Sequence, residues 1–342
     1  MRQKKYKQQS GVALITALII TSIAVSLAGV VMYRQQIQIR LSSNIAHLEQ
    51  AYLYATGMED WAGTILQKSY KDHENYDSLE DDWAVLLPPI PIPGGVMNGQ
   101  LFDLQARINL NSLARPKPKP PKKQPTTGAQ TPPKQPKPDI AKITGIRLIN
   151  IMTQVDSDQD MGPPENFVDI LSDWIDKDQS TRDFGAESDY YQSMEPAYFS
   201  ADSLLASPTE LRLLKDMKEK IYKKLLEHTI ALPITTKTAI NMNTASLDIL
   251  KAIGFDQGSA EEIKKEREVR PFRNKKEFID YINNNSNITF KPENFEHDID
   301  VKSSFFLLQG SVRINNARLF INSVLERKNG QISVIMRDFS NP

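Results

Sequence analysis

The sequence predicts an α+β fold in which a long N-terminal helix packs on an antiparallel sheet, with a large inserted helical domain. Three observations lead to this class. An uncharged apolar run occupies residues 12–32, helical periodicity continues behind it, and strand-like alternation occurs near residues 100–111 and again at 303–339. Because the segment between the two strand regions is mostly helical in pattern, a second domain must interrupt one sheet.

The N-terminus combines a basic leader with an apolar segment. The leader, residues 1–11, contains Lys4, Lys5 and Lys7, and residues 12–33 are the predicted transmembrane half of the long helix. A membrane-spanning helix needs about 20 apolar residues, and lysines ahead of it hold the N-terminus in the cytoplasm. We therefore expect the bulk of the chain to lie on the other side of the membrane.

The leader ends in a small residue, Gly11, which stands before the apolar run. An ordinary signal peptide is cut behind its apolar core, whereas cleavage between Gly11 and Val12 would leave the membrane helix on the mature chain. This arrangement is similar to the class III leaders of type IV pilins and type II secretion pseudopilins, which prepilin peptidase cuts. The alternative is an uncleaved signal anchor in which the glycine has no role.

The helical pattern continues past the membrane segment. Residues 33–67 contain no proline, and apolar side chains recur there at steps of three and four, which predicts one helix of roughly 80 Å at 1.5 Å per residue. Its second half is amphipathic and suits packing on a sheet, and Gly57 and Gly63 are its weakest positions. We expect residues 34–114 to hold this stalk helix and the first strands.

Alternation of apolar and polar residues predicts the strands. Residues 102–110 alternate strictly behind a proline-rich turn region that ends the helical part. Asn329-Gly330 offers a type I′ hairpin turn near the C-terminus. The candidate strands around it are residues 303–314, 317–327 and the segment from Ile332 onward. We expect residues 301–342 to complete the sheet.

The segment between the strand regions divides into a linker and a helical domain. Residues 115–138 are rich in proline and lysine and contain no acidic residue, which predicts a disordered, extended linker. We expect residues 139–300 to be the inserted α-helical domain, in which Ser207 and Glu210 have the spacing of a capping box. The candidate helices are residues 143–155, 167–176, 208–227, 245–253, 259–267 and 275–283.

Residues 241–258 of this domain are similar to a helix-hairpin-helix unit, which in other proteins binds the backbone phosphates of DNA. Such hairpins expose backbone amides at closely spaced glycines. Here Asp256 lies between Gly254 and Gly258, where its carboxylate would repel a phosphate. We therefore expect a structural helix pair and no nucleic acid partner.

Carboxylates gather between residues 156 and 189, against only Lys177 and Arg182. Such a run repels itself unless a cation is bound or the segment stays solvated as an acidic face. Calcium takes about six to eight oxygen ligands in flexible geometry, and Gly185 would allow the turn that gathers the carboxylates. Asp173 would share a helix face with Asp176. The candidate ligands are Asp173, Asp176, Asp178, Glu187 and Asp189.

A second possible metal site precedes this loop at Asp156, Asp158 and Asp160, a run similar to the start of an EF-hand loop. Its glycine, Gly162, falls one position late, and Phe167 stands where the closing glutamate is needed, so the run is not an EF-hand. A calcium site and a solvated acidic segment are both open for it.

The composition argues against catalysis. The chain has 342 residues, no cysteine and four scattered histidines without zinc-binding spacing, so disulfides and thiolate chemistry are excluded. Its 42 basic and 42 acidic residues give a net charge of zero, which provides no general attraction to nucleic acid. No nucleophile-elbow or phosphate-loop motif occurs. We expect a protein that is not an enzyme.

Segments along nearly the whole chain resemble, in order, the type II secretion system minor pseudopilin K, the GspK family. They include GVALITALIIT, RQQIQIR, DLQARINLNSLA, LSDWIDKDQSTRDFGAESDYY, LLASPTELRLL, INMNTASLDILKAIG, EVRPFRNKKEFI and SSFFLLQGSVRIN. The resemblance implies a pilin-like fold and a non-enzymatic subunit at the tip of the type II secretion pseudopilus, which initiates or caps its assembly for protein export across the outer membrane.

The resemblance also implies partners, processing and a cofactor. The expected partners are minor pseudopilins I and J in a tip complex, the major pseudopilin, and prepilin peptidase, with N-methylation of Val12 after cleavage. Calcium (Ca²⁺) is expected as a structural ion in the acidic loop. The expected location is the bacterial inner membrane, single-pass, with the bulk of the chain in the periplasm.

Thr16 would be the fifth residue of the mature chain, where most pilin-like subunits carry a glutamate that compensates the N-terminal amine of a neighbouring subunit. A subunit at the tip has no preceding neighbour, and an unpaired carboxylate in lipid costs several kcal/mol. The threonine therefore fits the tip position that the resemblance implies. Taken alone, it is explained equally well as a membrane-helix threonine that bonds a carbonyl one turn back.

Two alternatives from other classes remain at this point. One is a pilin-like anchored DNA-uptake protein that uses the helix-hairpin-helix unit. The other is a signal-anchored periplasmic scaffold, for which no cleavage at Gly11 is expected.

Overall fold

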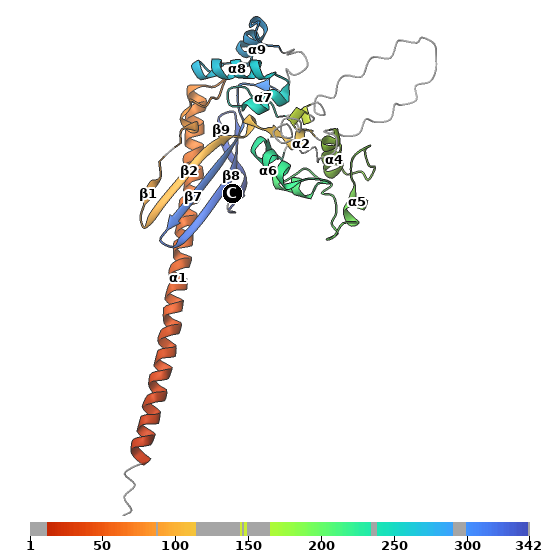
Figure 1. Ribbon diagram of the computed structural model, residues 1–342. Coiled ribbons are helices and arrows are strands. Elements are labelled where there is room, and N and C mark those ends of the chain that lie inside the picture. Colours follow the sequence, from red (N-terminus) through yellow and green to blue (C-terminus); the bar gives the residue numbers. More distant parts are fainter. Residues whose placement is uncertain are drawn as a thin grey trace, which may run out of the picture.

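A long helix runs along one face of a five-stranded sheet and extends far beyond it (Figure 1). Further helices lie at the end of the sheet away from this extension and to one side of it. The computed structural model describes residues 12–86, 88–113, 144–145, 147–148, 165–233, 238–289 and 299–340. The expected α+β class, with a long N-terminal helix packed on an antiparallel sheet, is confirmed.

The long helix α1 (Val12–Asp72) is unbroken over 61 residues. Residues 12–46 are exposed along their whole length, whereas the buried positions beyond them recur at steps of three and four, as an amphipathic helix on a sheet requires. Gly57 and Gly63 do not interrupt the helix, and Gly63 faces the Ile332 side chain. The residues buried along α1 are Ala51, Ala55, Met58, Glu59, Ala62, Leu66 and Ser69.

The sheet joins strands from both ends of the sequence. Its order is β1-β2-β7-β8-β9, with every neighbouring pair antiparallel. Because β2 and β7 pair directly, the elements between them are an insertion into the sheet. Asn329 and Gly330 both have positive φ (52° and 77°), as the predicted type I′ turn requires. The strands are β1 (Ile90–Ile92), β2 (Gly95–Asp103), β7 (Phe305–Ile314), β8 (Ala317–Lys328) and β9 (Gln331–Asp338).

Two glycines allow α1 to approach the sheet closely. Gly99 of β2 and Gly310 of β7 lie opposite each other, and Met58 of α1 packs against both. A Cβ at Gly310 would lie 2.7 Å from the Met58 methyl carbon, and one at Gly99 would lie 3.3 Å from its sulfur. Side chains at these positions would push the helix away from the sheet.

Strand β2 differs at both ends from the strand predicted at residues 102–110. It begins at Gly95 and stops at Asp103 instead of continuing through residue 110. The Asp103 side chain accepts a hydrogen bond from the Gln105 backbone N–H at 2.8 Å, and this local cap starts a short 3₁₀ helix. The elements that replace the predicted strand are η2 (Leu104–Ala106), β3 (Ile108–Asn109) and α2 (Leu110–Leu113), with β3 parallel to β4 (Thr229–Ile230).

The inserted segment is helical, with one break that the pattern did not predict. The capping box of Ser207 and Glu210 is present. However, Leu214 is extended and ends η3, and Asp216 has a φ of 58° before α6 begins at Glu219, so the predicted helix 208–227 is split in two. The helical elements are α4 (Glu165–Ile175), α5 (Ser188–Gln192), η3 (Pro208–Leu213), α6 (Glu219–His228), α7 (Leu247–Ile253), α8 (Gln257–Val269) and α9 (Lys275–Asn284). A 3₁₀ turn, η1 (Asp82–Ala84), follows α1, and β5 (Ile240–Asn241) pairs with β6 (Ile299–Asp300).

Among the described residues, three apolar clusters hold these parts together. One lies between α1 and the sheet, around Leu66, Leu101 and Phe306. A larger one joins the inserted helices, from Phe167 in α4 to Phe278 in α9. The third is small and packs Leu104, Ile230, Leu232 and Phe305 where the insertion meets the sheet. The 115–138 linker, most of the 143–155 helix and the leader lie outside the described residues, and the domain boundaries stay predictions.

A buried carboxylate connects the insertion to the sheet. Asp103, at the end of β2, accepts hydrogen bonds on Oδ2 from Asn241 Nδ2 (3.1 Å), Thr244 Oγ1 (2.5 Å) and Ser303 Oγ (2.7 Å). Asn241 and Thr244 belong to the insertion, whereas Ser303 leads into β7. We call these four hydrogen-bonded side chains the joint. All four are buried, so the joint excludes water and fixes the insertion on the sheet.

An ion pair extends the same joint to the chain after α1. Asp77 and Arg327 of β8 are both buried and are hydrogen-bonded through Asp77 Oδ2 and Arg327 Nη2. Arg327 Nη2 also donates to the Ser303 carbonyl at 2.6 Å, and the Ser303 N–H donates to Asp77 Oδ2 at 2.8 Å. Asn241 Nδ2 donates to the Asp77 carbonyl at 3.2 Å. Three parts of the chain thus meet in one polar network.

The joint should make the folded state more stable in mild acid. Burial raises the pKa of Asp103 from 3.8 to about 6, although hydrogen bonds from Thr244 and Ser303 oppose this. The folded protein therefore binds a proton at Asp103 more readily than the unfolded chain. The resulting stabilisation is complete below about pH 4, is lost as the pH rises through 6, and amounts to at most about 3 kcal/mol.

The measurement is the free energy of unfolding at pH 5 and pH 7.5 for wild type and Asp103→Asn. The wild type should lose more stability over this interval than the variant does. Asp60→Asn, which changes an exposed carboxylate on α1, should keep the wild-type slope. Equal slopes for wild type and Asp103→Asn would contradict the assignment.

Candidate functional site

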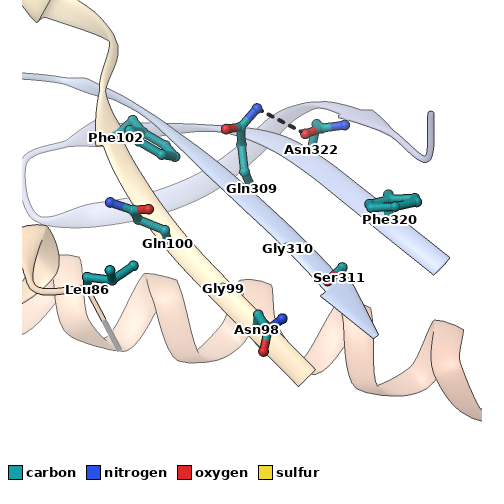
Figure 2. A pocket seen from close by; sticks show the side chains of 10 residues that line it. All are labelled: Leu86, Asn98, Gly99, Gln100, Phe102, Gln309, Gly310, Ser311, Phe320 and Asn322. Carbon is teal, nitrogen blue, oxygen red and sulfur yellow. Dashed lines mark hydrogen bonds between the residues drawn. The ribbon is translucent and has the colours of Figure 1, made fainter. Parts of the chain in front are cut away.

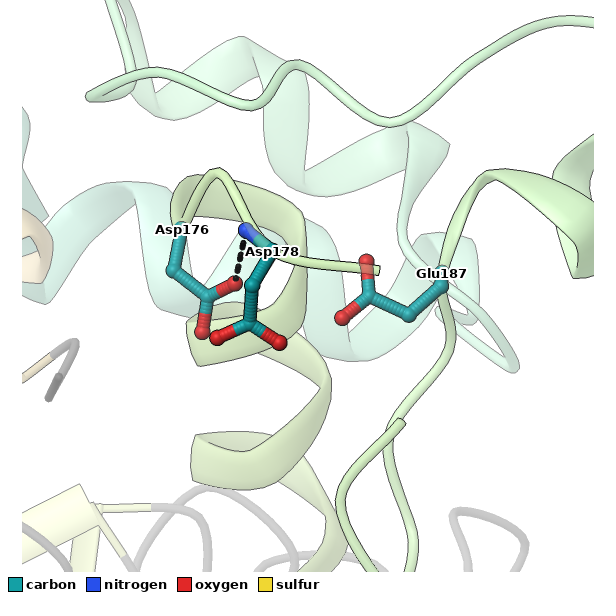
Figure 3. A group of neighbouring side chains, drawn as sticks. All are labelled: Asp176, Asp178 and Glu187. Carbon is teal, nitrogen blue, oxygen red and sulfur yellow. Dashed lines mark hydrogen bonds between the residues drawn. The ribbon is translucent and has the colours of Figure 1, made fainter. Parts of the chain in front are cut away.

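Three carboxylates converge in the loop between α4 and α5 (Figure 3). Asp176 and Asp178 follow the last turn of α4, and Glu187 directly precedes α5. One oxygen of each lies within 4.8 Å of the others. Asp178 and Glu187 lie two and eleven positions after Asp176 in the sequence. The loop turns back and brings the three side chains together.

The loop is shaped by its own side chains. Asp176 Oδ1 accepts a hydrogen bond from the Asp178 N–H at 3.3 Å, and Asp178 Oδ1 accepts one from the Ser180 N–H at 2.9 Å. These contacts turn the chain back after α4. Glu187 is buried, Asp176 is half-buried and Asp178 is exposed. The group is therefore open to solvent on one side.

An arginine holds the base of the loop. Arg182 Nη1 pairs with Asp176 Oδ2 at 2.6 Å and with Asp173 Oδ1, while the Arg182 N–H donates to Asp173 Oδ2 at 3.0 Å. Burial opposes the positive charge of Arg182, but the bonds to Asp176 and Asp173 outweigh it and raise its pKa. Asp173 is completely buried, and Arg182 provides the opposite charge that a buried carboxylate needs.

A glycine makes room for that contact. A Cβ at Gly185 would lie 1.8 Å from Asp173 Oδ2, so Gly185→Ala must displace the Asp173 carboxylate from Arg182. We expect a loss of about 1–3 kcal/mol in the free energy of unfolding. Gly258→Ala is the matched control, because its nearest neighbour would be 3.7 Å away. Equal stability of Gly185→Ala and wild type in urea unfolding would refute the close contact.

The structure groups only part of the predicted ligand set. Asp176, Asp178 and Glu187 come together, whereas Asp173 is held by Arg182, and Asp189 lies in the first turn of α5 outside the group. Asp156, Asp158 and Asp160 lie outside the described residues. Sequence reasoning missed the role of Arg182, for which the only signal was a lone arginine within an acidic run.

The donor set suits a hard cation. Three carboxylates offer up to six oxygens, and oxygen ligands in a flexible loop are typical of calcium sites. Within the described residues, the Asp176, Asp178 and Glu187 group could hold a metal ion.

The second candidate feature is the exposed end of α1. Among the described residues, α1 is the one helix long and apolar enough to cross a membrane. Val12 is its first residue, and Thr16 Oγ1 donates to the carbonyls of Val12 (2.9 Å) and Ala13 (3.0 Å). Thr16 thus satisfies its hydroxyl within the helix. Gly11 lies outside the described residues.

Known proteins with similar sequences cover nearly the whole chain. Residues 106–234 match the family "Type II secretion system (T2SS), protein K". Type II secretion system protein K of Pseudomonas aeruginosa is 31% identical over 339 residues, which cover 96% of this chain and 92% of that protein. Protein K of Aeromonas hydrophila is 28% identical and covers 97% of both chains.

A solved structure has the same fold. The crystal structure of the GspK-GspI-GspJ complex from enterotoxigenic Escherichia coli contains a chain that matches with a TM-score of 0.70 and 25% sequence identity. The match covers 89% of this chain and 100% of that chain. The similarity to the Pseudomonas protein covers 96% of this chain and 92% of that protein, at 31% identity. This chain therefore belongs to the type II secretion system protein K family of minor pseudopilins, which are structural proteins and not enzymes.

Proposed function

We propose that this chain is the tip subunit of a type II secretion pseudopilus and acts in a complex with minor pseudopilins I and J. The observation that carries the proposal is the match, over 89% of this chain, to a chain in the crystal structure of a GspK-GspI-GspJ complex. Tip placement would make the protein an initiator or cap of pseudopilus assembly for export across the outer membrane.

The arrangement of the insertion supports placement at the tip. Helices α7, α8 and α9 lie at the end of the sheet that is farthest from the apolar half of α1 (Figure 1). Subunits of a filament that pack through α1 stack along the direction of that helix. A further subunit above this one would meet the inserted helices, so the insertion obstructs growth beyond it.

The exposed face of α1 supports packing against partner stalks. Apolar side chains continue beyond the membrane-length segment and are exposed at steps of three and four, which is the spacing of a helix-packing stripe. Partner helices from pseudopilins I, J and the major pseudopilin would bury this stripe. The residues are Ile37, Leu41, Ile45, Leu48 and Tyr52.

Processing and location follow from the leader. Prepilin peptidase would cut between Gly11 and Val12, with N-methylation of Val12, and residues 12–33 would hold the protein in the bacterial inner membrane with the sheet and insertion in the periplasm. The absence of a carboxylate at Thr16 suits a subunit without a preceding neighbour.

The DNA-uptake alternative is less well supported. Asp256 caps α8 by accepting a hydrogen bond from the Ser259 N–H at 2.7 Å. This bond lowers the pKa of Asp256, so the hairpin carries a negative charge where a DNA phosphate would have to bind.

Calcium is the ion proposed for the acidic loop. Asp176, Asp178 and Glu187 would hold it, and Asp173 would act through Arg182 to keep Asp176 in place. Bound calcium would supply positive charge that offsets the repulsion of the three carboxylates, and its binding would contribute folding energy.

The functional proposal is tested with the full chain expressed with and without prepilin peptidase and with tagged minor pseudopilins I and J. With the peptidase, we expect an intact mass that starts at Val12 and co-purification of all three proteins. Gly11→Val should retain Met1 and serves as the processing control. A chain that keeps residues 1–11 both with and without the peptidase would favour the signal-anchored scaffold instead.

A further inference from the structure

The outer face of the sheet carries a groove of unusual composition (Figure 2). It lies over β2, β7 and β8, with Leu86 at one margin, and has a volume of about 240 Å³. Four of its lining residues are amides, two are phenylalanines and none is charged, in a chain whose residues are 25% charged. The polar and aromatic lining consists of Asn98, Gln100, Phe102, Gln309, Ser311, Phe320 and Asn322.

The amides are arranged to offer hydrogen bonds to a neutral ligand. Gln309 Nε2 donates to Asn322 Oδ1 at 3.3 Å, and Asn322 Nδ2 donates to the Ser340 carbonyl at 3.0 Å, which orients both side chains. Within the described residues, no hydrogen bond engages the amides of Asn98 and Gln100. Each amide offers a carbonyl acceptor and two N–H donors, so the groove presents both kinds of partner.

The rings add an apolar contact. Figure 2 shows Gln309 and Asn322 between Phe102 and Phe320. The guanidinium of Arg318 lies 4.6 Å from the Phe320 ring centre and occupies one face of that ring, so Phe102 is the main apolar platform. Amides beside a phenyl ring suit a ligand that has hydroxyl and acetamido groups around its edge and C–H groups on its face. A sugar ring has this chemistry.

Two other ligand classes fit less well. An ionic ligand would find no opposite charge among the lining residues. An extended peptide that adds a strand would need free backbone groups, but β2, β7 and β8 are paired along the groove from Asn98↔Ser311 to Gln309↔Asn322. The volume is also below the roughly 300–1,000 Å³ of sites that enclose drug-sized molecules, which suits a single ring of a polymer.

The groove faces away from the stalk. Met58 of α1 packs on the opposite face of the same strands, against Gly99 and Gly310. This inference rests on the proposed function, in which subunits pack through their α1 helices. Such packing leaves the groove on the outside of the filament. A periplasmic filament is surrounded there by the cell wall, whose glycan strands consist of N-acetylated sugars.

We propose that the groove over β2, β7 and β8 is a weak binding site for the glycan strands of the periplasmic cell wall. Gln100 and Gln309 bind the hydroxyl and acetamido groups, and Phe102 supports the face of the sugar ring. Such contacts would guide the tip through openings in the wall without ionic attraction.

The test uses the full chain in lipid nanodiscs, with purified peptidoglycan sacculi in a pelleting assay and with an N-acetylglucosamine tetramer as competitor. Wild type should pellet with the sacculi, should be displaced by the tetramer and should still bind at high salt. Gln100→Ala/Gln309→Ala should weaken binding at least tenfold. Phe102→Leu, which keeps apolar volume but removes the ring, should also weaken it.

The matched control is Gln257→Ala/Gln331→Ala, which removes two exposed glutamines elsewhere and should bind like wild type. Wild type that stays in the supernatant, equal loss in the control variant, or displacement by salt but not by the tetramer would each overturn the proposal. Co-purification of every variant with minor pseudopilins I and J is measured in parallel. If wild type forms the complex but does not bind glycan, only the proposed glycan site is refuted. If wild type does not form the complex, the proposed function is refuted.

Discussion

Replacing Arg327 with leucine is expected to lower the free energy of unfolding by about 3–5 kcal/mol. The change leaves the Asp77 carboxylate buried without its cation, and burial already raises the pKa of Asp77 in the intact protein, against the effect of Arg327. It also removes the hydrogen bond to the Ser303 carbonyl. The loss should be visible in urea unfolding of the detergent-solubilised chain, with tryptophan fluorescence as the signal.

Two further variants separate the ion pair from general packing. Arg327→Leu combined with Asp77→Asn should recover part of the lost stability, because the uncompensated charge is gone. Arg313→Leu on the neighbouring strand changes an exposed arginine and should stay within about 0.5 kcal/mol of wild type. A small effect of Arg327→Leu, similar to that of Arg313→Leu, would show that the joint does not hold the insertion on the sheet.

Calcium is expected to stabilise the protein through the acidic loop by about 2.7 kcal/mol when its concentration is about 100 times the dissociation constant. Glu187→Gln should remove most of this gain, because it takes away a charged ligand that is only 3% exposed. Asp178→Asn should also weaken it. The measurement is the calcium dependence of thermal unfolding after treatment with a chelator.

Asp189→Asn is the sharpest control for this site. The sequence includes Asp189 among the ligands, whereas the structure leaves it outside the group. The variant should therefore keep the calcium response, and magnesium should stabilise less than calcium, since it demands stricter octahedral geometry. A response that is unchanged by Glu187→Gln but lost in Asp189→Asn would assign the ion to a different set of ligands.

The long-range order of this fold could be predicted from the sequence because its periodicities are strong. The unbroken helix over residues 12–67 and the C-terminal hairpin at Asn329-Gly330 follow directly from spacing and turn chemistry. The end of β2 could not be predicted. At Asp103 the alternation continues in the sequence, but the Asp103 side chain accepts hydrogen bonds from the Gln105 backbone N–H and from Asn241 of the insertion, and the strand ends there.

The acidic site was predicted in composition and only partly in geometry. Spacing along a helix correctly placed Asp173 and Asp176 near each other, since both contact Arg182. Helical spacing did not predict the ion pair between Asp173 and Arg182, because that pair depends on how the loop folds back around Gly185. Contacts that depend on loop closure lie beyond what periodicity predicts.

If this protein stands at the tip of the pseudopilus, its position along the filament must be unique to one end. The test co-expresses this chain with the major pseudopilin and minor pseudopilins I and J, and labels the resulting filaments with an antibody against the inserted domain for electron microscopy. We expect one label at a single end of each filament. Labels distributed along the filament length would contradict the tip placement.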